Sequence, residues 1–138
     1  MTDMRYEAPS SLNDAVHLLS GANGAAKIFA GGTDVLVQLH SEMIEPELLV
    51  DIKNIPELTA MAEKDGVWTV GAAVSGMKVI NDPGFSAAWP GVCDGVALIG
   101  SVQVKGRASI GGNLCNASPA ADSVPAIIAA GRSGEPHV

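Results

Sequence analysis

Cysteine is scarce in this 138-residue sequence, which contains Cys93 and Cys115 and no third thiol. An iron–sulfur cluster is normally held by a larger set of cysteine ligands, so the sequence excludes a cluster bound by this chain alone. The histidines are scattered and no CxxC spacing occurs, so no metal site is predicted. Both cysteines are expected to be small buried residues.

Basic residues are also few: 8 Lys and Arg stand against 15 Asp and Glu, which gives a net charge of −7. This balance argues against a nucleic-acid partner, because a phosphate backbone is bound mainly by clustered cations. No apolar run approaches the roughly 20 residues of a membrane span, and residues 1–9 lack the basic and apolar regions of a secretory signal. We therefore expect a cytoplasmic chain without a membrane span.

Small residues are concentrated between positions 108 and 122, around the pair Gly111-Gly112. Glycine reaches positive φ without the steric cost that other residues incur, and such a loop can direct several backbone N–H groups at one anion. We expect the backbone to approach a ligand at this pair. Asn113, Ser118 and Asp122 would then be free to bind sugar hydroxyls. The alternatives are an exposed turn and, for Asp122, an N-cap of the next helix.

A second glycine pair, Gly31-Gly32, lies in the segment IFAGGTDV from Ile28 to Val35. A short apolar run precedes the pair, and Thr33 or Asp34 is expected to begin a helix after it. The N–H groups at the start of a helix stabilise a phosphate, as does the helix dipole. A carboxylate is unfavourable beside a phosphate, so we expect Asp34 to cap the helix rather than to contact a ligand.

Strands and helices are expected to alternate through a first subdomain and to continue in a second. The expected strands are 5–8, 27–30 and 48–52 in the first subdomain, and the runs 59–63 and 67–72 of a hairpin in the second. One helix begins at Ser11, with Asp14 in a capping box and an apolar face of Leu12, Ala15, Val16 and Leu19; the next carries Val35, Leu36, Leu39 and Met43. Residues 54–57 are expected to link the two subdomains, and Asp65-Gly66 to form a hairpin turn. Ser75 is expected to begin a helix that the turn at 81–84 ends. Pro90 and Pro125 are expected in the first turns of two later helices.

Several segments together resemble the FAD-carrying medium subunits of the molybdenum hydroxylase family, which includes carbon monoxide dehydrogenase and bacterial xanthine dehydrogenase. The resemblance extends from Met4 to about Gly131. It is carried by AGGTD at 30–34, SIGGN at 109–113 and ASPxxD at 117–122, and by MRYEAPSSLNDAVHLL at 4–19, LLVDIKNIPEL at 48–58 and IGSVQVKGR at 99–107.

The resemblance implies an α+β, PCMH-type FAD-binding fold of two α/β subdomains, residues 1–57 and 58–138, with FAD between them. Members of the family continue beyond this point, so a C-terminal part of the domain is expected to be missing, and the last seven residues do not look like a strand. The implied cofactor-binding residues are Ile28, Phe29, Ala30, Gly31, Gly32, Thr33, Asp34 and Val35 for the pyrophosphate, and Ile99, Gly100, Ser109, Ile110, Gly111, Gly112, Asn113, Ser118 and Asp122 for the rest of the molecule.

The function that the resemblance implies is electron transfer within an oxidoreductase complex. Electrons would pass from a molybdenum centre through iron–sulfur clusters to FAD, then to an acceptor such as NAD or a quinone. The partners would be an iron–sulfur subunit and a molybdopterin subunit, and with 4% aromatic residues the contact with them would be aliphatic. No side chain is predicted to act as a catalytic acid or base, because the flavin carries the redox chemistry.

Two other functions compete with this one. A self-contained flavin oxidoreductase would need clustered acid and base side chains, which the sequence does not offer. A truncated remnant would fold without binding FAD or would bind it weakly. Protein that stays colourless after incubation with FAD would favour the remnant.

Overall fold

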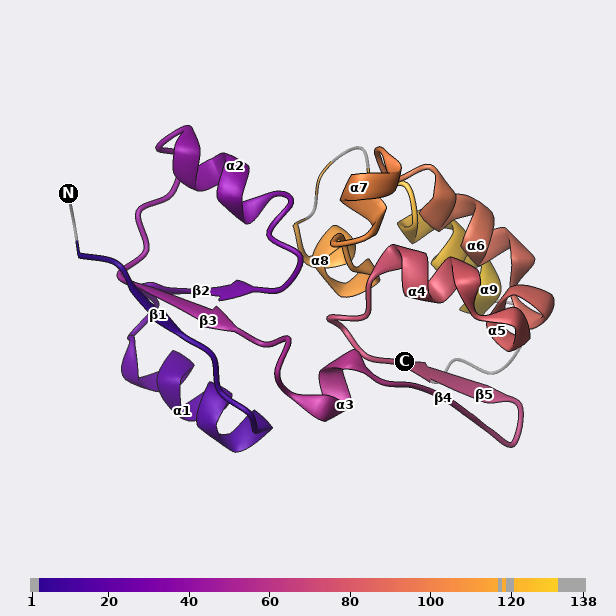
Figure 1. The fold of residues 1–138 in the computed structure, drawn as a ribbon, viewed down its shortest axis with the longest axis horizontal. Coiled ribbons are helices and arrows are strands. Elements are labelled where there is room, and N and C mark those ends of the chain that lie inside the picture. The colour runs from indigo at the N-terminus through magenta and orange to yellow at the C-terminus, as the bar shows by residue number, and fades with distance from the viewer. Residues whose placement is uncertain (1–2, 117, 119–120, 132–138) are drawn as a thin grey trace.

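The computed structural model describes residues 3–116, 118 and 121–131 as two parts that lie side by side (Figure 1). The first part contains a parallel sheet in the order β1-β3-β2, so β3 is the central strand and its four residues are all buried. Its elements are β1 (Arg5–Glu7), α1 (Leu12–Gly21), β2 (Ala26–Phe29), α2 (Val35–His40), β3 (Leu48–Asp51) and α3 (Pro56–Thr59).

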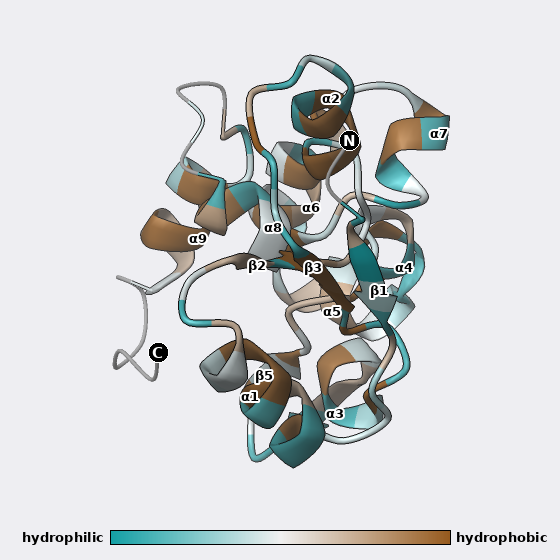
Figure 2. Cartoon of the chain, turned by 90° about the vertical axis from the view of Figure 1, so that its left-hand side faces the viewer, coloured by the Kyte–Doolittle hydropathy of each residue, from teal (hydrophilic) through white to brown (hydrophobic). Residues whose placement is uncertain are grey.

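One face of β3 packs against α1. Leu48 and Val50 alternate along the strand and form a buried cluster with Ala15, Ile52 and Ile55. Figure 2 shows β3 as a hydrophobic strand at the centre of this part. Helix α1 begins as predicted, since the Oγ of Ser11 accepts a hydrogen bond from the N–H of Asp14 at 3.2 Å.

The apolar face of α1 differs from the predicted one. Ala15 is buried, and Leu18 and Leu19 pack against the same cluster. Leu12 and Val16 were also expected on this face, but they are 42% and 60% exposed. The helix is therefore rotated so that the stripe through Ala15, Leu18 and Leu19 meets the sheet.

The second part begins with an antiparallel hairpin and is otherwise helical in the residues described. Asp65 and Gly66 have φ of 54° and 81°, which suits a two-residue turn and confirms the predicted hairpin. Val79, Phe85 and Val96 lie in the core of this part. Its elements are β4 (Met61–Lys64), β5 (Val67–Val70), α4 (Gly76–Asn81), α5 (Pro83–Ala88), α6 (Pro90–Ala97), α7 (Val102–Lys105), α8 (Ile110–Cys115) and α9 (Val124–Gly131).

Some local details differ from the predictions. Helix α4 ends at Asn81, as the predicted turn at 81–84 requires, but the chain passes directly into α5, because Asp82 caps that helix and its Oδ1 accepts the N–H of Phe85 at 2.8 Å. The predicted linker at 54–57 contains the start of α3. Helix α2 ends at His40, so Met43 lies beyond it and is 72% exposed.

The α+β class is confirmed, but packing crosses the predicted subdomain boundary. Leu58 and Ala73, on the far side of residue 57, both pack against the cluster of the first part. The division into residues 1–57 and 58–138 therefore stays a prediction. None of the helices in the described ranges is long and apolar enough to cross a membrane.

Candidate functional site

The first glycine motif follows β2 at the carboxyl edge of the parallel sheet, the edge at which sheets of this kind bind ligands. Gly32 has φ of +74°, and a Cβ there would lie 2.6 Å from the ring of Phe29. Within the described residues, the backbone N–H groups from Gly31 to Val35 donate no hydrogen bond. Consecutive unpaired donors of this kind are the backbone arrangement that binds an anion.

The two glycine motifs meet. A Cβ built on Gly31 would lie 2.1 Å from the carbonyl oxygen of Arg107, which directly precedes the second motif. The amide of Gln38 on α2 donates to the side-chain oxygen of Asn116 at 3.2 Å. Figure 1 shows the segment after β2 turning towards α8. The structure thus brings the predicted residues around Gly31 and Gly111 into one region.

The second motif is not the predicted loop, because residues 110–115 form helix α8 and both its glycines are helical. Ser109 is the N-cap, and its Oγ accepts the N–H of Gly112 at 3.0 Å. The glycine that the packing requires is Gly111, where a Cβ would lie 2.6 Å from the carbonyl oxygen of Ala72. At Gly112 the nearest atom would be the Oγ of Ser109 at 3.0 Å. Close packing, rather than positive φ, therefore explains the glycine at position 111.

Asn113 is only partly available for a ligand. Its Oδ1 accepts hydrogen bonds from the Oγ and the N–H of the buried Ser123, at 2.6 and 3.4 Å. The prediction that this side chain is free was wrong for the oxygen. A contact with a ligand would have to come from its amide NH2 group.

Neither predicted carboxylate cap is present. Asp34 precedes α2 but accepts no side-chain capping bond. Asp122 was an alternative cap for α9, but that helix begins at Val124, directly after Ser123. Asp122 is exposed, and its carboxylate accepts no hydrogen bond from the described residues. Both groups are therefore exposed carboxylates near the glycine motifs.

The remaining predicted residues divide between core and surface. Ile99 is buried in the second core, where Ile110 also packs, and neither side chain is on the open surface. Gly100 has φ of +51°, and Ile28 is half exposed. Of the ASPxxD segment, residues 117, 119 and 120 lie outside the described residues, as do the C-terminal residues 132–138.

Sequence reasoning missed a polar network beside the first motif. The hydroxyl of Tyr6 donates to Oδ2 of Asp51. The Nζ of Lys53 donates to the same oxygen at 2.8 Å and to the carbonyl oxygen of Ala30 at 2.9 Å. The available signal was the place of Asp51 at the end of a buried strand, since parallel strands bring their carboxyl ends to one edge.

The network shifts both acids in it. Burial alone would raise the pKa of Asp51, but hydrogen bonds from Lys53 and Tyr6 and the charge of Lys53 outweigh it and hold the pKa below its ordinary value. The hydrogen bond to Asp51, followed by burial and the charge of Asp51, raises the pKa of Tyr6. Asp51 is therefore an anion at neutral pH, and Tyr6 keeps its proton.

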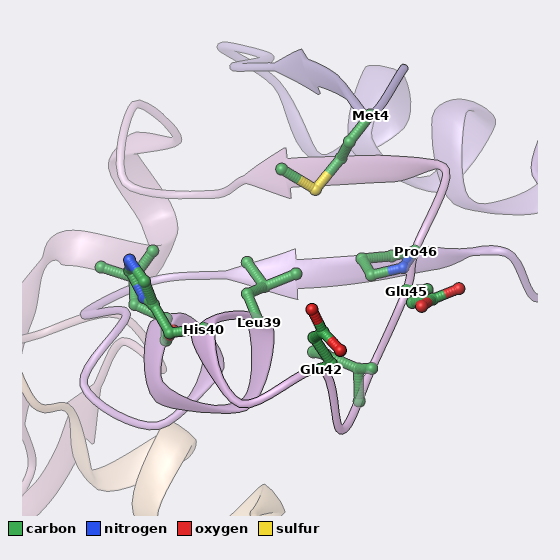
Figure 3. Close-up of a pocket in the computed structure, with 8 residues that line it drawn as sticks. Met4, Leu39, His40, Glu42, Glu45 and Pro46 are labelled. Carbon is green, nitrogen blue, oxygen red and sulfur yellow. The ribbon is translucent and has the colours of Figure 1, made fainter. Parts of the chain in front are cut away.

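A pocket of about 700 Å³ lies elsewhere, between α2 and the start of β1 (Figure 3). Met4 and Pro46 lie at the amino ends of β1 and β3, whereas the glycine motif follows the carboxyl end of β2. Glu42 and Glu45 also line the pocket and disfavour an anion. Because of its position and its carboxylates, this pocket is not the candidate site.

The cysteines differ from each other. Cys93 is buried as predicted, but Cys115 is exposed at the end of α8, so the prediction was wrong for it. Across the part of the chain that the structure describes, no three His, Cys, Asp or Glu side chains gather as metal ligands.

Comparisons with known proteins identify the family of this chain. Residues 2–133 match the family described as the FAD binding domain in molybdopterin dehydrogenase. The chain is 37% identical over 119 residues to the xanthine dehydrogenase FAD-binding subunit of Escherichia coli O157:H7, covering 86% of this chain and 40% of that subunit. It is 34% identical over 117 residues to the carbon monoxide dehydrogenase medium chain of Hydrogenophaga pseudoflava, covering 85% and 41%.

A solved structure shows the same fold. Quinoline 2-oxidoreductase from Pseudomonas putida 86 matches with a TM-score of 0.80 and 30% identity, over 83% of this chain and 40% of that chain. The chain thus spans about 40% of the length of these relatives. The resemblance noted in the sequence is confirmed, and so is FAD as the cofactor of the family. The match over residues 2–133 shows that this chain belongs to the FAD-binding domain family of the molybdopterin dehydrogenases.

Proposed function

We propose that this chain binds FAD across its two glycine motifs and contributes the flavin to an oxidoreductase complex. The observation that carries the proposal is the run of unpaired N–H groups from Gly31 to Val35, whose first residue lies against the backbone of Arg107, directly before the second motif. An acidic chain needs such backbone dipoles to hold a diphosphate. The residues present therefore fit the cofactor of the family.

The roles of the residues follow from what each one leaves unpaired. Within the predicted segment 28–35, the unpaired N–H groups of residues 31–35 would hold the diphosphate. On the second motif, the amide of Asn113 and the carboxylate of Asp122 would bind hydroxyl groups of the cofactor. The flavin supplies the redox chemistry when it is bound, and the chain positions it. No residue of this chain is assigned as a catalytic acid or base.

We further propose that the chain works beside an iron–sulfur subunit and a molybdopterin subunit in the cytoplasm, with NAD or a quinone as the acceptor. The relatives are subunits of xanthine and carbon monoxide dehydrogenases, which supports membership of such a complex. Cys93 and Cys115 are too few to hold a cluster, so an iron–sulfur donor would have to lie outside these 138 residues, and we place it on the partner subunit.

The test of binding is a titration of the purified chain with FAD, followed by flavin fluorescence. We expect quenching that saturates at one FAD per chain and a yellow protein after gel filtration. Protein that remains colourless would refute the proposal and favour a remnant that folds without the cofactor. Adding the iron–sulfur and molybdopterin subunits should then allow their substrate to reduce the flavin. Reduction by that substrate without the partners would contradict the assigned role.

Asp122→Asn tests the hydroxyl contact. A carboxylate accepts stronger hydrogen bonds than a neutral amide, so we expect the dissociation constant for FAD to rise about 3- to 10-fold. The melting temperature should stay unchanged, because this carboxylate accepts no hydrogen bond from the residues that the structure describes. Asp94→Asn is the matched control, since it removes another exposed carboxylate of the same part, on α6. Equal affinities for Asp122→Asn and the parent would exclude the contact.

A further inference from the structure

We infer that Lys53 is a positioning residue for the first glycine motif: it fixes the peptide that joins Ala30 to Gly31 and thereby aims the first N–H group at the ligand. The inference rests on the proposed binding of FAD. Its basis is the bond from the Nζ of Lys53 to the carbonyl oxygen of Ala30, at 2.9 Å. This is the last carbonyl group before the unpaired N–H groups begin.

The direction of that carbonyl sets the direction of the next N–H group. All described peptide bonds are trans, and in a trans peptide the C=O and N–H bonds point in opposite directions. With the carbonyl of Ala30 held by Lys53, the N–H of Gly31 must point away from the ammonium group. Glycine at position 31 would otherwise let this peptide rotate more easily than a residue with a Cβ would. Lys53 therefore fixes the direction of the N–H group of Gly31.

Lys53 is itself held in place from several sides. Its Nζ donates to Oδ2 of Asp51 at 2.8 Å and lies 4.2 Å from the centroid of the Phe29 ring. Its backbone N–H donates to Oδ1 of the same carboxylate at 3.0 Å. Asp51 is buried and also accepts the hydroxyl of Tyr6, so the carboxylate cannot turn away. A flexible lysine side chain is in this way confined to one position.

The charge of Lys53 contributes less than its geometry. Its ammonium group forms an ion pair with Asp51, which offsets most of its field at a nearby anion. An effect through geometry should appear in the protein without FAD, whereas an effect through charge alone would appear only in binding. The two can therefore be separated by experiment.

The experiment compares Lys53→Met with the parent in two measurements. NMR relaxation of the FAD-free chain should show backbone order parameters of Gly31, Gly32 and Thr33 falling from about 0.85 to below about 0.6, the values of rigid and flexible backbone. Titration with FAD should show a dissociation constant about tenfold higher. Lys53→Gln keeps a polar end but not the reach or the three donors of the ammonium group, and it should give the same result if the methionine variant does not fold.

Lys78→Met is the matched control, because Lys78 also donates through Nζ to a backbone carbonyl, that of Thr59 at 2.8 Å, in the other part of the chain. It should change neither measurement. Unchanged order parameters at residues 31–33 in the Lys53 variants would overturn the inference, whether or not the parent binds FAD. If the parent does not bind FAD but the order parameters at residues 31–33 still fall in the Lys53 variants, the proposed function is refuted and the positioning role is supported.

Discussion

Replacing Gly31 with alanine is expected to lower the affinity for FAD about a hundredfold, or about 2.8 kcal/mol. The new Cβ would lie 2.1 Å from the carbonyl oxygen of Arg107 and 3.0 Å from the backbone nitrogen of Ala108. Both are backbone atoms, so neither can rotate out of the way. The two glycine motifs would have to separate, and a ligand held by both would lose one set of contacts. Inserting an atom into close packing also costs stability, about 1–3 kcal/mol.

The measurements for Gly31→Ala are flavin fluorescence quenching and thermal unfolding by circular dichroism. Gly91→Ala is the control, because a Cβ at that position would meet nothing within 4 Å and its backbone does not have positive φ. A Gly31→Ala variant that binds FAD like Gly91→Ala would show that the motifs need not touch in the bound state.

Ile55→Ala is expected to cause the largest loss of stability, about 2–5 kcal/mol, and a fall in melting temperature of about 10 °C. Ile55 is 0% exposed and packs with Leu48 and Val50 of the central strand. Removing its outer atoms leaves a cavity in the cluster that supports β3 and the first glycine motif. Single domains are stable by only about 5–15 kcal/mol, so this is a large fraction of the total.

Thermal and urea unfolding of Ile55→Ala measure that loss. Val16→Ala is its control, since Val16 lies on α1 beside the same cluster but is 60% exposed, and its replacement should change the free energy of unfolding by no more than about 0.5 kcal/mol. Equal losses in the two variants would mean that the cluster around β3 does not stabilise the chain. NMR can follow the Ile55→Ala variant during unfolding. If the signals of Val50 disappear while those of Val79 and Val96 stay native, the predicted division near residue 57 is supported.

Local sequence signals were sufficient for much of the fold. Ser11 and Pro90 begin helices because a side-chain oxygen or a fixed φ suits that position in almost any context. Asp65-Gly66 forms the hairpin because its backbone preferences match a two-residue turn. The run Leu48–Asp51 is buried because it is continuously apolar apart from its last residue. These features depend on few neighbours, so a sequence can indicate them directly.

The details of the site depend on contacts between distant segments, which no local pattern encodes. By itself the sequence determined the family, the two glycine pairs and the order of most elements, because these follow from short motifs and local preferences. Only the tertiary structure showed that Gly31 lies against Arg107, that Gly111 lies against Ala72, and that Asn113 gives its oxygen to Ser123. It also placed Lys53 on the carbonyl of Ala30. The physical reason is that close packing and hydrogen-bond partners are set by where whole elements meet, and that follows from burial of the core as a whole.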